Sequence, residues 1–145
     1  MADLRPKRWF LPETPDVIGL LRRQLAVTIE GTERFVQWAS DDGLDLTDFR
    51  EIEARGERAK RDLLDALREA FITPIEPEDL YAISRGTGWI LDEIGDLVGE
   101  AEVLDCVPDD GIARMSERLA EAVREIDAAV TALVSSGDEA SAAAD

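Results

Sequence analysis

Two pairs of carboxylates are the side chains in this sequence whose type and spacing point to chemistry. Glu53 and Glu57 are four residues apart, and so are Asp92 and Asp96. On a helix, residues four apart lie one above the other on the same face, where two carboxylates repel each other unless a cation lies between them. Carboxylate oxygens are hard ligands that suit Mg, Ca, Mn or iron. The spacing therefore makes these four acids candidate metal ligands.

A second interpretation of the same acids stays open on sequence alone. Basic residues near the first pair along the chain include Arg50, Arg55, Lys60 and Arg61. Such residues are able to neutralise Glu53 and Glu57 by pairing with them. Asp92 and Asp96 point away from the apolar stripe of their own segment, as solvated surface acids do. A metal site and two solvated, ion-paired faces are both compatible with the pattern.

The composition excludes several kinds of functional site. The chain has no histidine and a single cysteine, Cys106, which excludes catalytic triads, histidine bases and thiolate zinc clusters. Di-iron four-helix bundles use Glu-x-x-His motifs, which a chain without histidine lacks as well. The formal net charge of −17 repels nucleic acid and anionic membrane surfaces, and it favours cations or positively charged protein surfaces. We therefore expect a protein that binds partners and is not an enzyme.

Four helical segments must position these acids. Apolar residues recur at helical spacing from about residue 14 to 40, 47 to 71, 77 to 98 and 112 to 134. Thr14 is the expected cap of the first segment, followed by Pro15, and Pro77 suits the first position of the third. Because the connections are short, neighbouring helices must run antiparallel. The sequence predicts an all-α, up-and-down bundle of four main helices over residues 14–134.

Two flanking segments are predicted to lie outside the bundle. Residues 1–13 form an N-terminal arm, and residues 135–145 form a disordered acidic tail of small and polar residues. Arg5, Lys7 and Arg8 in the arm are not followed by a long apolar stretch, so we expect no secretory signal. No apolar run is long enough to span a bilayer, and a single cysteine suits a reducing compartment. The expected location is the cytoplasm.

Several residues indicate contacts beyond a simple core. Trp89 lies opposite the apolar stripe of the third segment, which indicates a second contact surface or packing against the N-terminal arm. Trp9, in that arm, is expected to pack on the bundle or on a partner. Gly86 and Gly88 indicate close packing or a local irregularity in the third helix. Apolar residues of the fourth segment alternate by three and four, as in a coiled-coil seam: Ile112, Met115, Leu119, Ala122, Ile126, Ala129 and Leu133.

Residues 71–81, FITPIEPEDLY, resemble the junction between the second and third helices of PhoU-like proteins, in particular the phosphate transport regulators encoded beside Pit-type transporters. The match runs without a gap from about residue 52 to about residue 96. Counted back from Phe71, the E-x-x-x-D signature of the family falls on Glu53 and Glu57, with a glutamate in place of the aspartate. Counted forward, its D-x-x-x-D signature falls on Gly88 and Asp92, so the first acid is missing.

The resemblance implies a regulatory or accessory protein of inorganic phosphate transport. Such a protein binds a phosphate transporter or sensor protein at the inner face of the membrane, without inserting into the bilayer. The resemblance also implies that Glu53, Glu57 and Asp92, with Asp96 one turn on, hold a divalent or trivalent metal ion such as Fe, Zn, Mg or Mn. The family usually has two three-helix repeats and this chain has about one and a fourth helix, so a homodimer is expected. The alternative is a metal-free helical adaptor or oligomerisation module with no phosphate role.

Overall fold

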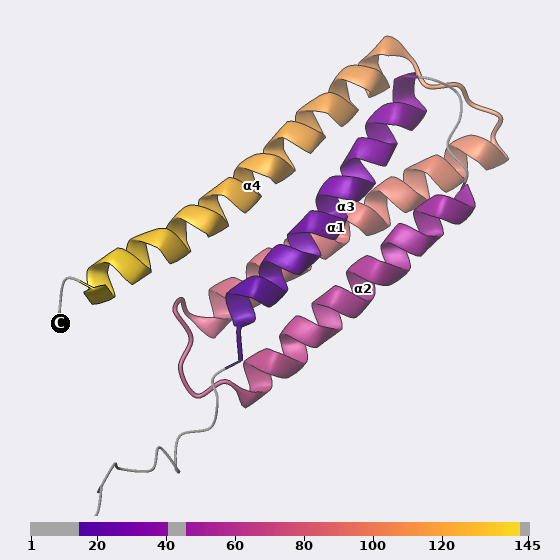
Figure 1. The fold of residues 1–145 in the computed structure, drawn as a ribbon. Coiled ribbons are helices and arrows are strands. Elements are labelled where there is room, and N and C mark those ends of the chain that lie inside the picture. Colours follow the sequence, from indigo (N-terminus) through magenta and orange to yellow (C-terminus); the bar gives the residue numbers. More distant parts are fainter. Residues whose placement is uncertain (1–14, 41–45, 143–145) are drawn as a thin grey trace, which may run out of the picture.

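The protein is built from four long helices, and the residues that the structure describes include no strand. The computed structural model describes residues 15–40 and 46–142 (Figure 1). The helices are α1 (Val17–Ser40), α2 (Leu46–Glu69), α3 (Pro77–Val103) and α4 (Asp110–Ala142). Consecutive helices run in opposite directions, so the predicted all-α bundle is confirmed. Within the described ranges, no helix combines the length and the apolar character needed to cross a membrane.

Side-chain hydrogen bonds set where α1 and α4 begin. Oδ1 of Asp16 accepts from the backbone N–H of Gly19 at 2.8 Å, and Oδ1 of Asp109 accepts from that of Ile112 at 2.9 Å. A cap of this kind typically contributes about 1 kcal/mol, because it satisfies a free N–H group of the first turn. Asp16 therefore caps α1, two residues after the expected cap. The expected cap, Thr14, lies outside the described residues.

Two helix boundaries also differ from the prediction. α2 ends at Glu69, shortly before the predicted end. α4 continues to Ala142, past the expected end at residue 134 and into the segment for which we predicted disorder. Residues 135–142 are mostly small, with two alanines and three serines, and a helix that is already nucleated continues at little further cost because only the nucleus is costly. The predicted arm, residues 1–13, and Trp9 within it lie outside the described residues.

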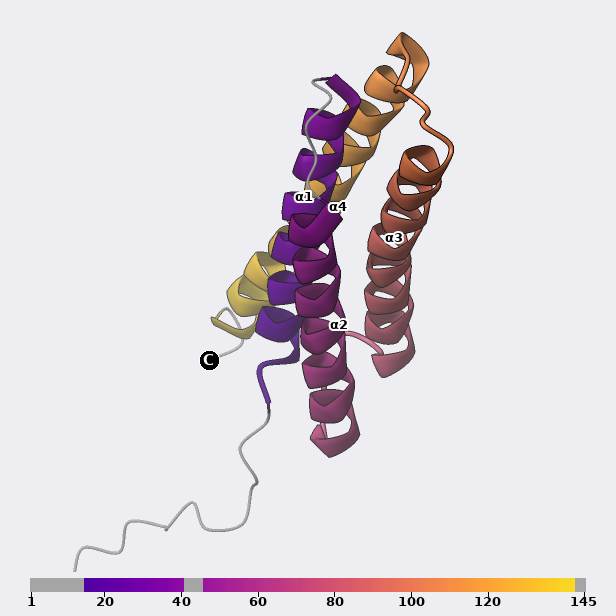
Figure 2. The same cartoon turned by 90° about the vertical axis from the view of Figure 1, so that its right-hand side faces the viewer.

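α1 is the central element of the packing, because it contacts each of the other three helices. α2 and α3 also pack on each other, so α1, α2 and α3 form a three-helix bundle. Figure 1 shows α4 and α2 on opposite sides of α1, and Figure 2 shows α3 set apart from α4. α4 is therefore an addition to a three-helix bundle and packs mainly along α1.

The buried apolar side chains form two clusters, one after the other along α1. The first contains Val17, Ile18, Leu21, Leu25, Leu63, Leu80 and Val130, and the second contains Phe35, Phe49, Ile52, Leu91, Ile94 and Val98. Burying one such side chain stabilises the fold by roughly 1.5–3 kcal/mol before the loss of entropy is counted. The second cluster has no buried member from α4, which contributes only the half-buried Ile112 and Leu119 there.

A buried polar layer lies between the two clusters and joins α1 to α3. Nε2 of Gln24 donates to the backbone oxygen of Ser84 at 2.7 Å and to Oγ1 of Thr87 at 3.1 Å. Oγ of Ser84 donates back to Oε1 of Gln24 at 2.6 Å. Among the described residues, no buried side-chain nitrogen or oxygen lacks a hydrogen-bond partner. Because unpaired polar groups are costly in a core, this layer fixes the register of α1 against α3.

Leu91 of α3 packs between two glycines. A Cβ added to Gly31 of α1 or to Gly56 of α2 would overlap with the methyl groups of Leu91, so the three helices approach closely here. The close packing expected at Gly86 and Gly88 is wrong. A Cβ added to Gly86 would meet open space, and one added to Gly88 would only make ordinary van der Waals contact with the side chains of Lys60 and Gln24. α3 continues as an α-helix through both positions.

The coiled-coil seam predicted on α4 does not coincide with its buried face. Among residues 110–133 of α4, the part of the helix whose side chains the structure describes, the buried ones are Ser116, Ala120, Val123 and Val130. Within the seam, Leu119 and Ile126 are half-buried, whereas Met115 and Leu133 are exposed. Because α4 has mainly one helix to pack against, part of its seam is left facing the space between α4 and α3.

Candidate functional site

Three of the four predicted acids come together where α2 packs on α3. Glu53 follows the buried Ile52 on α2, and Asp92 follows the buried Leu91 on α3. These buried neighbours fix how each helix is rotated, and they place Glu53 at the edge of the interface, half-buried. Asp92 and Asp96, one turn apart on α3, are both close enough to act electrostatically on Glu53.

The pKa of Glu53 is raised above its ordinary value of 4.5. Partial burial is the largest cause, followed by the negative charges of Asp92 and Asp96, whereas the charge of Arg50 acts in the opposite direction. In the part of the chain that the structure describes, no ion pair joins Glu53, Asp92 or Asp96 to a basic side chain. The chain itself therefore leaves this acidic face largely uncompensated.

Gly95 lies beneath the carboxyl group of Glu53. A Cβ at this position would overlap with Oε1 of Glu53 and would approach Cε1 of Phe49 to 3.2 Å. The side chain of Glu53 therefore lies across the backbone of α3, at a residue that falls between Asp92 and Asp96. A larger residue at position 95 would push the Glu53 carboxylate away from this place.

Glu57 does not join the other three acids. Its Oε2 lies 3.3 Å from Nζ of Lys60, and Nε of Arg61 donates to its backbone oxygen at 3.3 Å. The neighbouring Arg55 pairs with Glu30 of α1 instead. The ion-paired interpretation is therefore correct for Glu57, because Lys60 follows it at the helical spacing that favours pairing.

A cleft of about 710 Å³ opens beside the three acids, between the start of α2 and the end of α3. Its lining residues are Phe49, Arg50, Glu53, Gly95, Asp96, Gly99, Glu100, Val103 and Leu104. Val103 and Leu104 are 84% and 69% exposed, so the cleft combines carboxylates with uncovered apolar surface. Such a surface suits a side chain with an apolar stem and a cationic end, as in arginine and lysine.

The acids do not form a ready-made metal site. In residues 15–40 and 46–142, no group of three or more acidic or cysteine side chains is placed so as to hold a metal ion. The oxygens of Glu53, Asp92 and Asp96 are chemically suited to hard cations, but Glu57, the fourth predicted ligand, is paired with Lys60. The metal implied by the resemblance therefore stays a prediction.

The apolar part of the cleft and Gly95 are missing from the prediction based on the acidic pattern. Gly95 stands between Asp92 and Asp96 in the sequence, where a residue without a side chain lets a group from a neighbouring helix approach. Val103 is the last residue of α3, and Leu104 follows it at the start of the connection to α4. Nothing in their spacing distinguishes them from core residues, because only the packing shows that they are uncovered.

The chain is similar to the UPF0111 protein YkaA of Bacillus subtilis (strain 168), with 29% identity over 117 residues. The match takes in 77% of this chain and 57% of the relative, so the chain spans little more than half of the length of that protein. UPF0111 is a PhoU-like family, which agrees with the resemblance seen at residues 71–81. No family model matches the chain, and no solved structure gives a significant match.

Proposed function

We propose that this protein is a regulatory or accessory protein of inorganic phosphate transport that works by binding another protein and catalyses no reaction. The observation that carries the proposal is the convergence of Glu53, Asp92 and Asp96 beside an open cleft. The likeness to a UPF0111 protein agrees with the PhoU-like junction at residues 71–81, and a role in phosphate transport is what that resemblance implies. The proposed partner is a phosphate transporter or sensor protein that presents basic side chains at the inner face of the membrane.

A basic side chain of the partner would relieve the repulsion among these acids as well as pair with them. An isolated surface ion pair contributes only about 0–1 kcal/mol. Three carboxylates that already repel one another gain more when a cation lies among them, because each interaction of like charges is offset at the same time. Val103 and Leu104 supply the apolar contact for the stem of that side chain.

Binding to a reconstituted transporter tests this function. A Pit-type phosphate transporter from the same organism would be placed in lipid nanodiscs, and binding of the purified protein would be followed by biolayer interferometry. We expect saturable binding that weakens as salt is raised, and none to empty nanodiscs of the same lipids. Equal binding to transporter nanodiscs and to empty nanodiscs would contradict the proposal. So would a lack of binding both to the transporter and to a phosphate-sensor kinase that is reconstituted in nanodiscs in the same way.

A helical adaptor or oligomerisation module without a phosphate role is the second candidate. The observation in its favour is apolar surface left uncovered along α3 and α4, where Trp89 is 64% exposed and Met115 is 48% exposed. Light scattering during size-exclusion chromatography separates the two candidates when it is combined with the nanodisc measurement. If the protein forms an oligomer and does not bind the transporter, the result supports the adaptor or oligomerisation module. If it binds the transporter, the result supports the regulatory role.

A further inference from the structure

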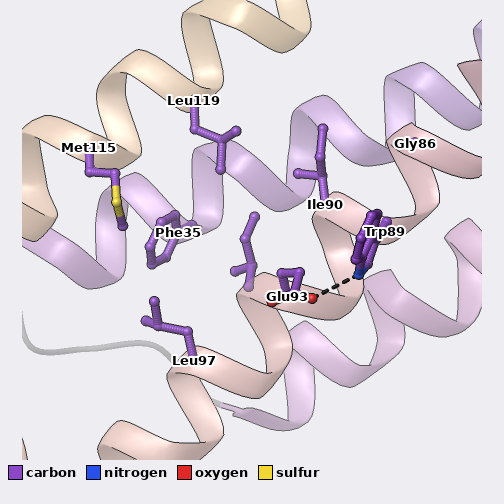
Figure 3. Close-up of a pocket in the computed structure, with 9 residues that line it drawn as sticks. Phe35, Gly86, Trp89, Ile90, Glu93, Leu97, Met115 and Leu119 are labelled. Carbon is purple, nitrogen blue, oxygen red and sulfur yellow. Dashed lines mark hydrogen bonds between the residues drawn. The ribbon is translucent and has the colours of Figure 1, made fainter.

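An apolar groove of about 390 Å³ runs between α3 and α4, on the other side of α3 from the acidic cleft. It exists because both helices pack on α1 but hardly on each other. Phe35 of α1, which is fully buried, lies at its base, and Leu97 of α3 and Met115 and Leu119 of α4 form its walls (Figure 3).

Trp89 stands at the edge of this groove. Its Nε1 donates to Oε1 of Glu93 at 2.7 Å, so the indole is held in place although more than half of it is exposed (Figure 3). The exposed Met115 continues the apolar surface across the groove onto α4. Continuous apolar surface of this kind on a soluble domain usually marks a place where another segment packs.

We propose that residues 5–11 of the same chain pack in this groove, with Trp9 and Phe10 against its apolar walls. These residues read RPKRWFL, and they combine three basic side chains with three large apolar ones. The segment precedes α1, whose first turn begins directly after Asp16. One core cluster contains Val17 at the start of α1, Leu80 of α3 and Val130 of α4. The start of α1 therefore lies between α3 and α4, at one end of the groove.

The distance from the start of α1 to Trp89 matches the reach of the segment. Gln24 is level with Ser84 and Gly31 is level with Leu91, so Trp89 lies between these levels, roughly 12–22 Å along α1 from Asp16. Trp9 precedes Asp16 by seven residues, which span up to about 23 Å when extended. An extended chain that turns back along the groove therefore brings Trp9 to the level of Trp89.

Charge favours the same register. With Trp9 beside Trp89, residues 5–8 lie further along α3, towards its C-terminal half. Glu93 lines the groove there, and Glu100, two helical turns further along α3, lies at the edge of the acidic cleft. Arg5, Lys7 and Arg8 then face carboxylates on a protein whose net charge is −17. Opposite charges that lie within about 8 Å of each other still attract at physiological salt, because screening dominates only beyond that distance.

The tether explains why the occupant is this segment and not a second copy. A segment joined to α1 by a few residues is present at the groove at an effective concentration on the order of millimolar, whatever the protein concentration. A second copy carries the same net charge of −17 and is repelled by the first, which opposes packing of its folded surface in the groove.

Cysteine cross-linking of the full chain tests the proposal. In a Cys106→Ser background, Pro6→Cys is combined with Met115→Cys at the groove, or with Ala54→Cys on the exposed side of α2 as the control. We expect an intramolecular disulfide at the groove to form at least about tenfold faster than in the control, because docking raises the local concentration. Adding Trp9→Ala and Phe10→Ala should lower the rate to that of the control.

Each other outcome overturns the proposal. Equal rates at Met115 and Ala54, or a rate that survives the loss of Trp9 and Phe10, would mean that the segment does not dock. A disulfide that joins two chains, seen as a dimer on a non-reducing gel, would assign the groove to a second copy. Far-UV circular dichroism of each variant confirms that the helices are intact, since positions 6, 9 and 10 precede them.

Discussion

Glu53 and Glu57 lie one helical turn apart on α2, yet their surroundings differ. Glu57 points to Lys60 on its own helix, and the pair lies at the surface. Glu53 is half-buried, lies over Gly95 of α3, and meets two further negative charges there. A single turn therefore separates a neutralised acid from one that is held in its charged form at a cost to the fold.

Replacing Glu53 by glutamine should stabilise the protein at neutral pH. Because its pKa is raised in the folded state, the charged form opposes folding at pH values above that pKa. The expected gain is up to about 1 kcal/mol, the size of a partly exposed charge interaction. Urea unfolding measures it, and the gain should shrink as pH falls through the raised pKa and vanish below 4.5, where the side chain is protonated in both states.

Glu57→Gln is the matched control, because it removes an acid that is paired with Lys60. We expect no gain in stability from this change at any pH. A Glu53→Gln protein that is less stable than the wild type at neutral pH would show that the carboxylate is already compensated.

Gln24→Leu should destabilise the protein, although it adds apolar volume to the core. The change leaves the hydroxyl of Ser84 without its acceptor in a buried layer, whereas the backbone oxygen of Ser84 still accepts from Oγ1 of Thr87. An unsatisfied buried group costs about 1–3 kcal/mol, which the urea midpoint would report as a shift to lower concentration. Gln37→Leu, at an exposed position of the same helix, controls for helix propensity and should change stability little. A Gln24→Leu protein as stable as the wild type would contradict the role given to this layer.

The packing of the helices depends on a few small residues. Gly31 and Gly56 allow Leu91 to enter between α1 and α2, and this contact holds the three helices together at the level of the second core cluster. α4 lacks an equivalent contact with α3. The gap between α3 and α4 therefore arises because glycines allow close approach among α1, α2 and α3, whereas α4 has no such contact with α3.

Two glycine-to-alanine changes should have opposite effects. Gly31→Ala places a Cβ against the buried Leu91, and this overpacking should destabilise the protein by about 1–3 kcal/mol. The better helix propensity of alanine offsets up to about 1 kcal/mol of this loss. Gly86→Ala meets open space on α3 and should stabilise by up to about 1 kcal/mol. Thermal unfolding of both variants tests this, and a stabilising Gly31→Ala would mean that Leu91 is free to move aside.

The positions of the helices follow largely from the sequence, whereas the place of α4 does not. Apolar spacing and proline positions predict four helices, and Pro77 begins α3 as expected. The resemblance to PhoU-like proteins, and not the acidic spacing itself, implies that Glu53 and Asp92 share a site. It does not predict that α4 exposes Met115 of its seam, since this depends on which neighbours α4 finds. The pairing of Gln24 with Ser84 is hidden for the same reason: each polar residue alone looks like a surface residue.

The whole molecule carries a net charge of −17, and this charge opposes the compact state. Raising NaCl from about 10 to about 300 mM should therefore raise the melting temperature, because shorter screening lengths reduce the self-repulsion. Circular dichroism at 222 nm (the helical band) provides the readout. A second comparison uses MnCl2 and NaCl at the same ionic strength. If MnCl2 raises the melting temperature more than NaCl does, and the Glu53→Gln/Asp92→Asn/Asp96→Asn variant loses this difference, the cation site that the resemblance implies is present. A melting temperature that falls with NaCl would contradict the argument from net charge.

The proposed function depends on the acidic face of α2 and α3 being the surface that meets a basic partner. The most direct test compares two variants in binding to transporter nanodiscs at one salt concentration. One variant is Glu53→Gln/Asp92→Asn/Asp96→Asn, and the other is Glu117→Gln/Glu121→Gln/Glu125→Gln on the exposed side of α4. Both remove three negative charges, so they affect long-range attraction alike. We expect the first variant to lose at least about tenfold in affinity and the second to lose much less, whereas equal losses would contradict a binding site at this face.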